Sequence, residues 1–312
     1  MARKPRKKGI DVMVETSKTI GFLGTGLMGL PMAQRLLELG MPVVAFNRTS
    51  EKLRPLEKAG ARITDTSASV IAESDCTILM LTNALAIEEL VLGPQCRNKL
   101  KGKTLIQMGT IGPQESKNLA EAVTSAGGEY LEAPVLGSIP EAKAGQLLLM
   151  VGSTPAQFER WAEVLKNFGP EPVHIGPVGS AAALKLALNQ LIASLTAAFA
   201  LSLGFVRSGG VEVEAFMKIL RQSALYAPTF DKKLQRMLEG NYENPNFPTK
   251  HLLKDTKLFL QEAEALKLDV SSLAGVGKIL EKAVALKLGE LDYSALFDAV
   301  EQTAEMENKS ED

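Results

Sequence analysis

A lysine and an asparagine lie four residues apart at the start of a long apolar stretch, and both residue types can act in proton transfer. Lys185 belongs to the run Ala-Ala-Ala-Leu-Lys-Leu-Ala-Leu-Asn, which ends at Asn189. Apolar neighbours desolvate an ammonium group and lower its pKa, which brings a lysine into the range useful for acid–base catalysis. Residues four apart share one face of a helix, so the Asn189 amide can hydrogen-bond the same reactant. The alternative is a structural lysine whose side chain reaches from a core helix to the surface.

Three glycines near residue 25 follow the spacing Gly-x-Gly-x-x-Gly, between an apolar run and an amphipathic segment. The six residues of the motif are Gly24, Thr25, Gly26, Leu27, Met28 and Gly29. Gly24 permits a tight turn, Gly26 lets the backbone approach a pyrophosphate, and Gly29 lets the following helix pack closely against the strand. The free N–H groups at the start of that helix attract phosphate. The motif in this context predicts a dinucleotide-binding loop, with a glycine turn needed only for packing as the alternative.

The residues that would select the nucleotide follow the second apolar run. Proteins that bind NAD usually place an aspartate or glutamate there, which accepts hydrogen bonds from the ribose 2′-hydroxyl. This chain has Asn47, Arg48 and Thr49, 18 to 20 residues beyond Gly29. Arg48 can pair with a 2′-phosphate, and Thr49 can act as a neutral donor. The sequence therefore predicts NADP(H) as the cofactor, and the alternative is that Arg48 is a solvated loop residue.

Short apolar runs alternate with amphipathic segments through the first part of the chain. Strands are predicted at 19–23, 42–46, 77–81, 105–108, 129–132, 147–151 and 172–175. Helices are predicted at 27–39, 50–59 and 114–126. Nearly continuous apolar strands separated by helices are typical of a parallel sheet covered on both faces. We therefore predict an α/β Rossmann domain, doubly wound and with a mainly parallel sheet, over residues 19–178.

Strand-like runs disappear after Gly179, and longer helical patterns replace them. Helices are predicted at 181–207, 213–223, 230–238, 250–266, 272–288 and 293–306. We therefore expect an all-α C-terminal domain over residues 179–312, which serves the substrate site and oligomerisation. The boundary is placed at 177–179, where proline and glycine cluster.

Composition limits the classes of function. The chain has 312 residues, of which 46% are hydrophobic and 23% charged, and its formal net charge is −1. This mix is typical of a globular protein and gives no general attraction to nucleic acid or to anionic membranes. Residues 1–18 form a basic tail that we expect to be disordered, with a nucleic-acid or targeting arm as the alternative. Cys76 and Cys96 have no metal-ligand spacing, so we expect no metal site and a reducing, cytoplasmic compartment.

Residues 186–206 carry no charged side chain and reach the length of a membrane span. Polar residues interrupt this stretch at Asn189, Gln190, Ser194, Thr196 and Ser202, and no second such segment exists in the sequence. We therefore expect a long helix buried in protein and no membrane span. Part of this helix is expected to lie in a subunit interface, which predicts a homodimer or a homotetramer.

Four segments spread over the chain carry a resemblance to a known family. They are Ile20-Gly-Phe-Leu-Gly-Thr-Gly-Leu-Met-Gly29, Glu132-Ala-Pro-Val-Leu-Gly-Ser138, the helix with Gly179, Lys185 and Asn189, and Phe247-Pro-Thr-Lys-His-Leu-Leu-Lys-Asp255. They resemble the β-hydroxyacid dehydrogenases of the 3-hydroxyisobutyrate dehydrogenase type, and are most similar to the glyoxylate/succinic semialdehyde reductases. The resemblance covers residues 19 to about 306. It implies an oxidoreductase that acts on hydroxyl and carbonyl groups.

The resemblance also implies roles for the residues around the substrate. Lys185 would be the catalytic acid/base, and Asn189 would orient the substrate, whose carboxylate would be held at the turn of Gly137 and Ser138. One position departs from the family, because Leu136 stands where a serine is usual. The loss of one polar contact is worth about 1–3 kcal/mol. That is enough to change the preferred substrate and too little to argue against catalysis.

The cofactor cleft would be lined by Leu81, Thr82, Thr110 and Lys254, while Asp255 would fix its own helix by pairing. The function expected from the resemblance is the NADPH-dependent reduction of small semialdehydes and 2-oxo acids, such as succinic semialdehyde and glyoxylate. One alternative is an NAD-dependent dehydrogenase of the 3-hydroxyisobutyrate type, which Arg48 disfavours. The other is a non-catalytic, dehydrogenase-like binding module, which the basic residues at the N-terminus support and the presence of Lys185 and Asn189 disfavours.

Overall fold

Six parallel strands form the centre of the first part of the chain. The structure is a computed structural model, and it describes residues 18–301. The strands are β1 (Ile20–Leu23), β2 (Val43–Phe46), β3 (Arg62–Ile63), β4 (Cys76–Leu79), β5 (Thr104–Gln107) and β6 (Glu129–Glu132). They lie side by side in the order β3-β2-β1-β4-β5-β6. The strand order therefore reverses between β1 and β4, at the end of β1 that carries the glycine motif.

Three further strands extend the sheet beyond β6. They are β7 (Val135–Leu136), β8 (Leu148–Gly152) and β9 (Val173–Gly176). Strand β8 runs antiparallel to β6 and β7, whereas β9 runs parallel to β8. The sheet is thus mainly parallel, as predicted, and its antiparallel pairings are those of β8 with β6 and β7.

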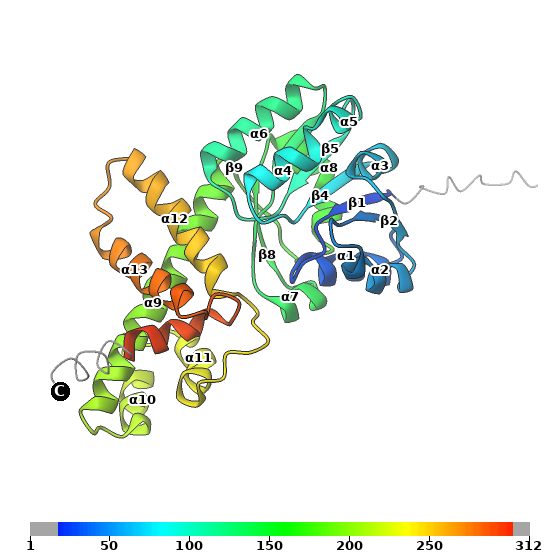
Figure 1. The fold of residues 1–312 in the computed structure, drawn as a ribbon. Helices are drawn as coiled ribbons and strands as arrows, with labels where there is room; N and C mark the ends of the chain where they lie inside the picture. The colour runs from blue at the N-terminus through cyan, green and yellow to red at the C-terminus, as the bar shows by residue number, and fades with distance from the viewer. Residues whose placement is uncertain (1–17, 302–312) are drawn as a thin grey trace, which may run out of the picture.

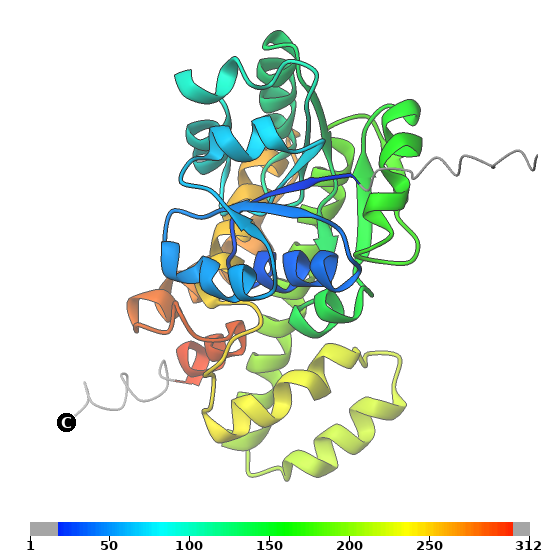
Figure 2. The ribbon, with the colours of Figure 1, turned by 90° about the vertical axis from the view of Figure 1, so that its right-hand side faces the viewer.

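Helices cover both faces of this sheet (Figures 1 and 2). They are α1 (Gly29–Glu38), α2 (Arg54–Lys58), α3 (Ser67–Glu73), α4 (Ala84–Val91), α5 (Pro94–Arg97), α6 (Pro113–Ser125), α7 (Ile139–Ala144) and α8 (Pro155–Leu165), with a short 3-10 turn at Ser50–Leu53. Adjacent residues of β5 show the two faces, because Leu105 belongs to one buried apolar cluster and Ile106 to another. The predicted doubly wound α/β class is confirmed.

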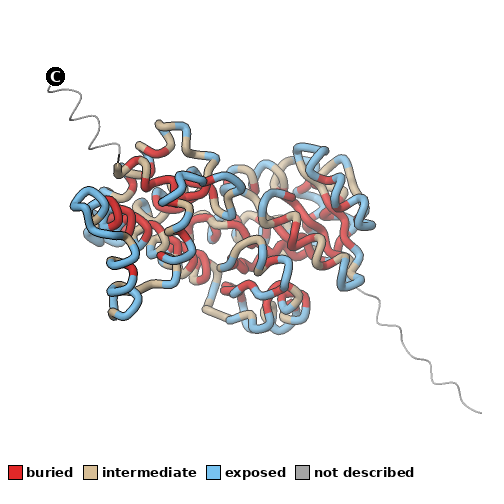
Figure 3. The backbone as a smooth tube through the Cα atoms, turned by 90° about the horizontal axis from the view of Figure 1, so that it is seen from below, coloured by how far each residue is buried: buried red, intermediate tan, exposed pale blue. Residues whose placement is uncertain are grey.

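The rest of the described chain is helical. Its elements are α9 (Ser180–Ser208), α10 (Val213–Gln222), α11 (Pro228–Glu239), α12 (Thr249–Ala265), α13 (Ser271–Ala285) and the 3-10 turn Tyr293–Ala295, which leads into a final helical segment that continues to Glu301. A third apolar cluster, centred on Phe199, Leu252 and Phe297, joins these helices. Figure 3 shows the buried residues running through both parts of the molecule. The predicted all-α class of this region is confirmed.

Helix α9 joins the two parts of the molecule. Three residues separate the end of β9 from its first residue, Ser180, and it packs against α12, α13 and β8. Its length and a mean hydropathy of 1.7 would by themselves suit a membrane span, yet 44% of its most apolar window is buried inside this one chain. The helix therefore acts as a packed element of the protein, with part of its apolar surface left uncovered.

Several elements differ from the sequence-based expectation. The strand predicted at 77–81 ends at Leu79, and the next residues turn into a loop that leads to α4. Helices α3, α4, α5, α7 and α8 were not predicted; the first four have at most eight residues, and α7 and α8 begin with a local capping box. Such short helices depend on caps and on contact with the sheet more than on apolar periodicity. The predicted disorder of the basic tail concerns residues that lie outside the described range.

Candidate active site

The glycine motif forms the loop between β1 and α1. Gly24 has a φ of 94°, a left-handed conformation that favours glycine, and Gly29 packs so closely that a side chain there would overlap the carbonyl oxygen of Gly24. A methyl group added at Gly26 would meet no protein atom within 4 Å. The space above Gly26 is therefore open, as a backbone that approaches a pyrophosphate requires. The loop fits a dinucleotide on these grounds.

Asn47 uses its side chain to hold this loop. Its Oδ1 accepts a hydrogen bond from the backbone N–H of Thr25 at 3.1 Å, and its Nδ2 donates to the carbonyl oxygen of Thr49 at 3.0 Å. The Thr25 side chain is buried, whereas Leu27 is 45% exposed and Met28 half-buried at the rim. Asn47 was predicted among the cofactor ligands, and the structure gives it a role in supporting the loop.

Arg48 lies at the carboxyl end of β2, on the surface beside the glycine loop. It is exposed and makes no hydrogen bond or ion pair with any residue from 18 to 301. Thr49 is likewise exposed and begins the 3-10 turn as its N-cap. No carboxylate follows β2 before Glu51. This end of the sheet therefore presents a free guanidinium where NAD-binding chains usually have an acid.

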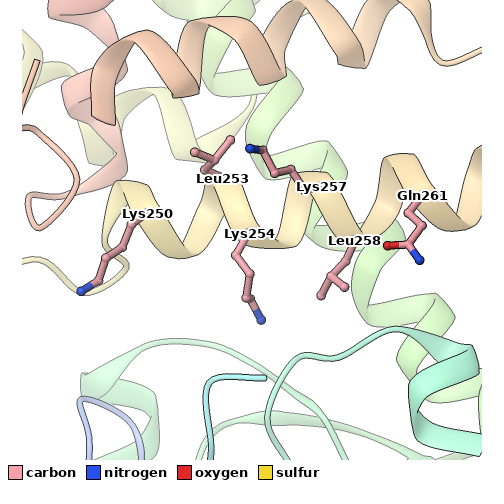
Figure 4. A pocket seen from close by; sticks show the side chains of 6 residues that line it. All are labelled: Lys250, Leu253, Lys254, Lys257, Leu258 and Gln261. Carbon is pink, nitrogen blue, oxygen red and sulfur yellow. The ribbon is translucent and has the colours of Figure 1, made fainter. Parts of the chain in front are cut away.

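Lys254 bridges the two parts of the molecule. Its Nζ donates to the carbonyl oxygen of Thr82 at 3.0 Å, in the loop after β4, and to that of Thr110 at 2.5 Å, in the loop after β5. Figure 4 shows this side chain reaching from α12 toward the loops of the sheet, whereas Lys257 points the other way. A pocket of about 340 Å³ is lined by residues of α12, from Lys250 to Gln261, and Lys257 is among them. The two hydrogen bonds of Lys254 bring it together with Thr82 and Thr110, and Leu81 is half-buried beside Thr82.

Gln107 holds the loop that carries Thr110. Its side-chain amide donates to the carbonyl oxygen of Gly109 at 3.0 Å and its Oε1 accepts from the N–H of the same residue. Gln107 is buried at the end of β5. These two hydrogen bonds fix the conformation of the loop, whose next residue, Thr110, accepts the hydrogen bond from Lys254.

Lys185 lies in the second turn of α9 and is only 8% exposed. Its pKa is lowered to about 8, first by burial and then by the neighbouring charge of Lys254, while the charge of Asp255 acts in the opposite direction. A lysine with a pKa near 8 can both release and regain a proton close to neutral pH. The alternative of an amine that reaches the surface is not what the structure shows.

Asn189 and Asp255 form a buried pair next to Lys185. Asn189 is 3% exposed and donates from Nδ2 to Asp255 Oδ2 at 2.6 Å. Asp255 also pairs with Lys254, whose Nζ lies 2.8 Å from Oδ1. The Asn189 carbonyl oxygen is buried and has no hydrogen-bond partner among residues 18–301. It is therefore available to a proton donor such as a hydroxyl or ammonium group.

Asp255 is the residue whose importance the sequence-based reading missed. It was expected only to fix its own helix by pairing, but it links α12 to α9 through Asn189 and raises the pKa of Lys185. Its position next to Lys254 was visible in the sequence. Its contact with a residue 66 positions away was not.

The turn of Gly137 and Ser138 is already occupied by a side chain of the protein. Both the N–H and the Oγ of Ser138 donate to Glu141 Oε2, at 2.7 and 2.6 Å, and these bonds lower the pKa of the Glu141 carboxyl. Leu136 precedes the turn and is half-buried in β7. The two donors expected to hold a substrate carboxylate therefore hold Glu141 in this structure.

Two family models match the chain end to end. Residues 19–176 match the NAD binding domain of 6-phosphogluconate dehydrogenase, and residues 179–300 match the NAD-binding domain of NADP-dependent 3-hydroxyisobutyrate dehydrogenase. Glyoxylate/succinic semialdehyde reductase 1 of Arabidopsis thaliana is 33% identical over 288 residues, which are 92% of this chain and 99% of that protein. The chain belongs to the β-hydroxyacid dehydrogenase family. It is a hydroxyacid dehydrogenase-type oxidoreductase with an NAD(P)-binding domain.

Other members of this β-hydroxyacid dehydrogenase family show how far the similarity extends. The cytokine-like nuclear factor N-PAC of Homo sapiens is 32% identical over 286 residues, which are 91% of this chain and 52% of that protein. This chain thus spans about half the length of the N-PAC proteins. The 3-hydroxyisobutyrate dehydrogenase of Mycobacterium tuberculosis, solved with L-serine, has a TM-score of 0.83 at 22% identity, and covers 91% of this chain and 99% of that one. This last likeness concerns the fold.

Proposed function

We propose that this β-hydroxyacid dehydrogenase reduces small semialdehydes and 2-oxo acids, such as succinic semialdehyde and glyoxylate, with NADPH as the cofactor. The observation that carries the proposal is Lys185, a buried amine with a pKa of about 8 that is influenced by the charge of Asp255, which in turn accepts a hydrogen bond from the buried Asn189. The similarity to a glyoxylate/succinic semialdehyde reductase supports this class of substrate. The free guanidinium of Arg48 supports NADPH.

Reduction of a carbonyl requires one hydride and one proton. The glycine loop and Arg48 would hold a dinucleotide, which would supply the hydride when bound. The Lys185 ammonium donates the proton to the oxygen that becomes the hydroxyl, and in the reverse direction the neutral amine accepts it. The Asn189 amide orients that oxygen, and Asp255 keeps enough negative charge nearby for Lys185 to be protonated near neutral pH.

Leu136 and Glu141 indicate how substrate choice would differ from that of relatives with the usual serine. Leu136 places an apolar side chain where a hydroxyl is usual, and Glu141 engages both donors of Ser138. A substrate carboxylate at this turn would have to displace Glu141 and overcome its repulsion. We therefore propose that glyoxylate and succinic semialdehyde remain the leading substrates but that their relative rates are altered.

A substrate panel tests this function. Glyoxylate, succinic semialdehyde, methylmalonate semialdehyde and tartronate semialdehyde would each be assayed with NADPH and, separately, with NADH. We expect turnover of at least one of the first two with NADPH, and a higher kcat/KM with NADPH than with NADH. Higher kcat/KM with NADH and methylmalonate semialdehyde would favour the NAD-dependent 3-hydroxyisobutyrate-type alternative.

The similarity to the N-PAC nuclear factors favours a second candidate, a dehydrogenase-like module that binds a partner and does not catalyse. Lys185 and Asn189 argue for catalysis. Both side chains are buried, so they cannot form a surface that binds a protein partner, and the lowered pKa of Lys185 suits proton transfer. The same panel separates the candidates. A chain that turns over no semialdehyde, yet binds DNA through residues 1–8, would support the binding module.

We also propose that the protein is a homo-oligomer. Helix α9 leaves large apolar side chains exposed at Leu191, Leu201 and Phe205, with exposed fractions of 51%, 63% and 79%. Exposed apolar surface of this kind marks an association site, and a second copy of the same helix is its simplest partner. A cytoplasmic location is proposed because both cysteines are free, buried thiols, as in reducing compartments.

A further inference from the structure

A buried carboxylate connects the end of the sheet to the start of the helix that carries Lys185. Glu132 is the last residue of β6 and is 1% exposed. Its Oε1 accepts hydrogen bonds from the backbone N–H groups of Gly179 at 2.8 Å, Ala181 at 2.8 Å and Ala182 at 3.1 Å. One side chain in the sheet thus binds three amides at the start of α9, across a sequence separation of 47 to 50 residues.

These amides have no other cap. The first N–H groups of a helix lack partners within the helix, and a side chain at the N-cap position usually accepts from them. The N-cap of α9 is Gly179, which has no side chain to do so and whose φ of 99° favours glycine. The carboxylate of Glu132 fills this role from another element, and its negative charge suits the positive end of the helix dipole.

The other carboxylate oxygen and the surrounding packing prevent Glu132 from turning away. Its Oε2 accepts from Ser116 Oγ, which lies 2.9 Å from the Tyr130 hydroxyl. A side chain at Gly152, on the neighbouring strand β8, would overlap the Glu132 carboxylate. Burial raises the pKa of Glu132, and its hydrogen bonds oppose that rise. The carboxylate is held from three sides.

The position of Lys185 depends on this junction. Lys185 follows Ala181 by four residues, about one helical turn and about 6 Å along the axis. A shift of the first turn of α9 therefore moves the amine relative to the sheet, whose loops carry the cofactor cleft. Displacement of a reacting group by about 1 Å can cost about 100-fold in rate.

We propose that Glu132 is a positioning residue, which fixes the start of α9 so that Lys185 and Asn189 face the cofactor cleft of the sheet. It acts by geometry, because the pKa of Lys185 is set by burial, Lys254 and Asp255. Asp255 would then influence the protonation of the Lys185 amine, and Glu132 would determine the position of that amine relative to the sheet. This role rests on the proposed reductase function, since it concerns the proton donor of that reaction.

Kinetics of Glu132→Gln and Glu132→Ala test the proposal, with Glu129→Gln as the matched control. Glu129 begins the same strand and pairs with Arg160, on the side away from α9. We expect kcat per folded molecule to fall about 10- to 100-fold in Glu132→Ala, and less in Glu132→Gln, which retains one acceptor oxygen. The Kd for NADPH and the pH midpoint of kcat should stay as in the wild type. The control should keep the wild-type kcat.

Amide hydrogen exchange provides a readout that needs no turnover. In Glu132→Ala, the amides of residues 179–182 should exchange faster than in the wild type, while those of β5 keep their protection. Unchanged exchange at 179–182, or a loss of kcat that follows the folded fraction alone, would overturn the proposal. If the wild type turned over none of the tested semialdehydes, the reductase function would fail. The exchange experiment alone would then decide whether Glu132 holds α9.

Discussion

Two opposing influences act on one amine in the active site. Burial lowers the pKa of Lys185 to about 8, and the negative charge of Asp255 opposes this effect. Without the carboxylate, the pKa of Lys185 would be lower still, and less of the amine would be protonated at neutral pH. Without burial, it would hold its proton too firmly to exchange it with a substrate. The chemistry at the residue scale therefore depends on the pair rather than on the lysine alone.

Replacement of the lysine tests its role directly. Lys185→Ala should lower kcat by about 10²- to 10⁴-fold, because general acid catalysis contributes factors of that size. The Kd for NADPH should change by less than about threefold, since the residue acts on the transferring proton. Steady-state kinetics and a fluorescence titration with NADPH measure the two effects. Lys218→Ala, at an exposed lysine of α10, is the control and should retain wild-type rates.

The pH dependence of kcat/KM reports the ionisation of Lys185. Reduction needs the protonated amine, so its rate should be high below pH 8 and fall as the pH rises through about 8, whereas the oxidation should rise over the same range. Asp255→Asn removes the charge that raises the pKa of Lys185, so the fall should begin at a lower pH. Asp269→Asn, at an exposed position before α13, serves as the control. An unchanged profile in Asp255→Asn would contradict the assignment.

Cofactor preference is expected to depend on Arg48. Arg48→Asp should weaken the binding of NADPH by about 10- to 100-fold, the value of a charge-assisted hydrogen bond. Binding of NADH should change far less. Titration of both nucleotides checks this, with Arg97→Asp on α5 as a control for the change in charge. Equal losses for the two nucleotides would remove Arg48 from the selector role.

At the scale of elements, the glycine loop shows why two similar residues have different tasks. Gly26 faces open space, whereas a side chain at Gly29 would overlap the backbone of Gly24. One glycine leaves room for a ligand and the other for the packing of α1 on β1. Single side chains also connect other elements. Lys254 connects α12 to the loop after β4, Asp255 connects α12 to α9, and Glu132 connects β6 to the start of α9.

Alanine at these two positions should separate ligand binding from stability. Gly26→Ala should change the free energy of unfolding by less than about 0.5 kcal/mol. It should weaken NADPH binding at least about tenfold, because a methyl group enters the pyrophosphate site. Gly29→Ala should lower the free energy of unfolding by about 1–3 kcal/mol through overpacking. Denaturant unfolding and NADPH titration measure both, and a stable Gly29→Ala variant would contradict the packing role.

At the scale of the whole molecule, the two parts meet along α9 and α12 (Figure 1), and several large apolar side chains of α9 are exposed. The first turns of α9 bury Lys185 and Asn189 within the chain, while Leu201 and Phe205 farther along are exposed. One helix therefore carries the candidate site residues near its beginning and exposed apolar side chains near its end.

Charge on that surface should prevent self-association. The double variant Leu201→Glu and Phe205→Glu should elute as a monomer in size-exclusion chromatography with light scattering, at a concentration where the wild type is a dimer or larger. Desolvation of the two carboxylates in an interface explains the expected change. Leu85→Glu, at a similarly exposed leucine of α4, should keep the wild-type mass. A wild type that is itself monomeric would contradict the proposed interface.

The sequence by itself determined the fold class, and it predicted a set of candidate site residues. The glycine spacing, the apolar strands and the helices are each encoded by patterns among residues that are close together in the sequence. Such patterns predict an element without knowledge of the rest of the fold. Lys185 and Asn189 could be paired in advance because a helix places residues four apart on one face. The strand predicted to end at 81, and the short helices that were not predicted, lie where local patterns are weakest.

Only the tertiary structure decided which side chains meet across elements. Asp255 reaches Asn189, Glu132 reaches the start of α9, and Asn47 reaches the glycine loop through contacts that span between 22 and 66 residues. Such contacts depend on how helices and strands pack, and no periodicity in the chain encodes their partners. For the same reason the Ser138 turn could be located in the sequence, while its capture by Glu141 became visible only in the folded chain. Local patterns determine the elements of this protein, and their packing determines the charges and distances within its active site.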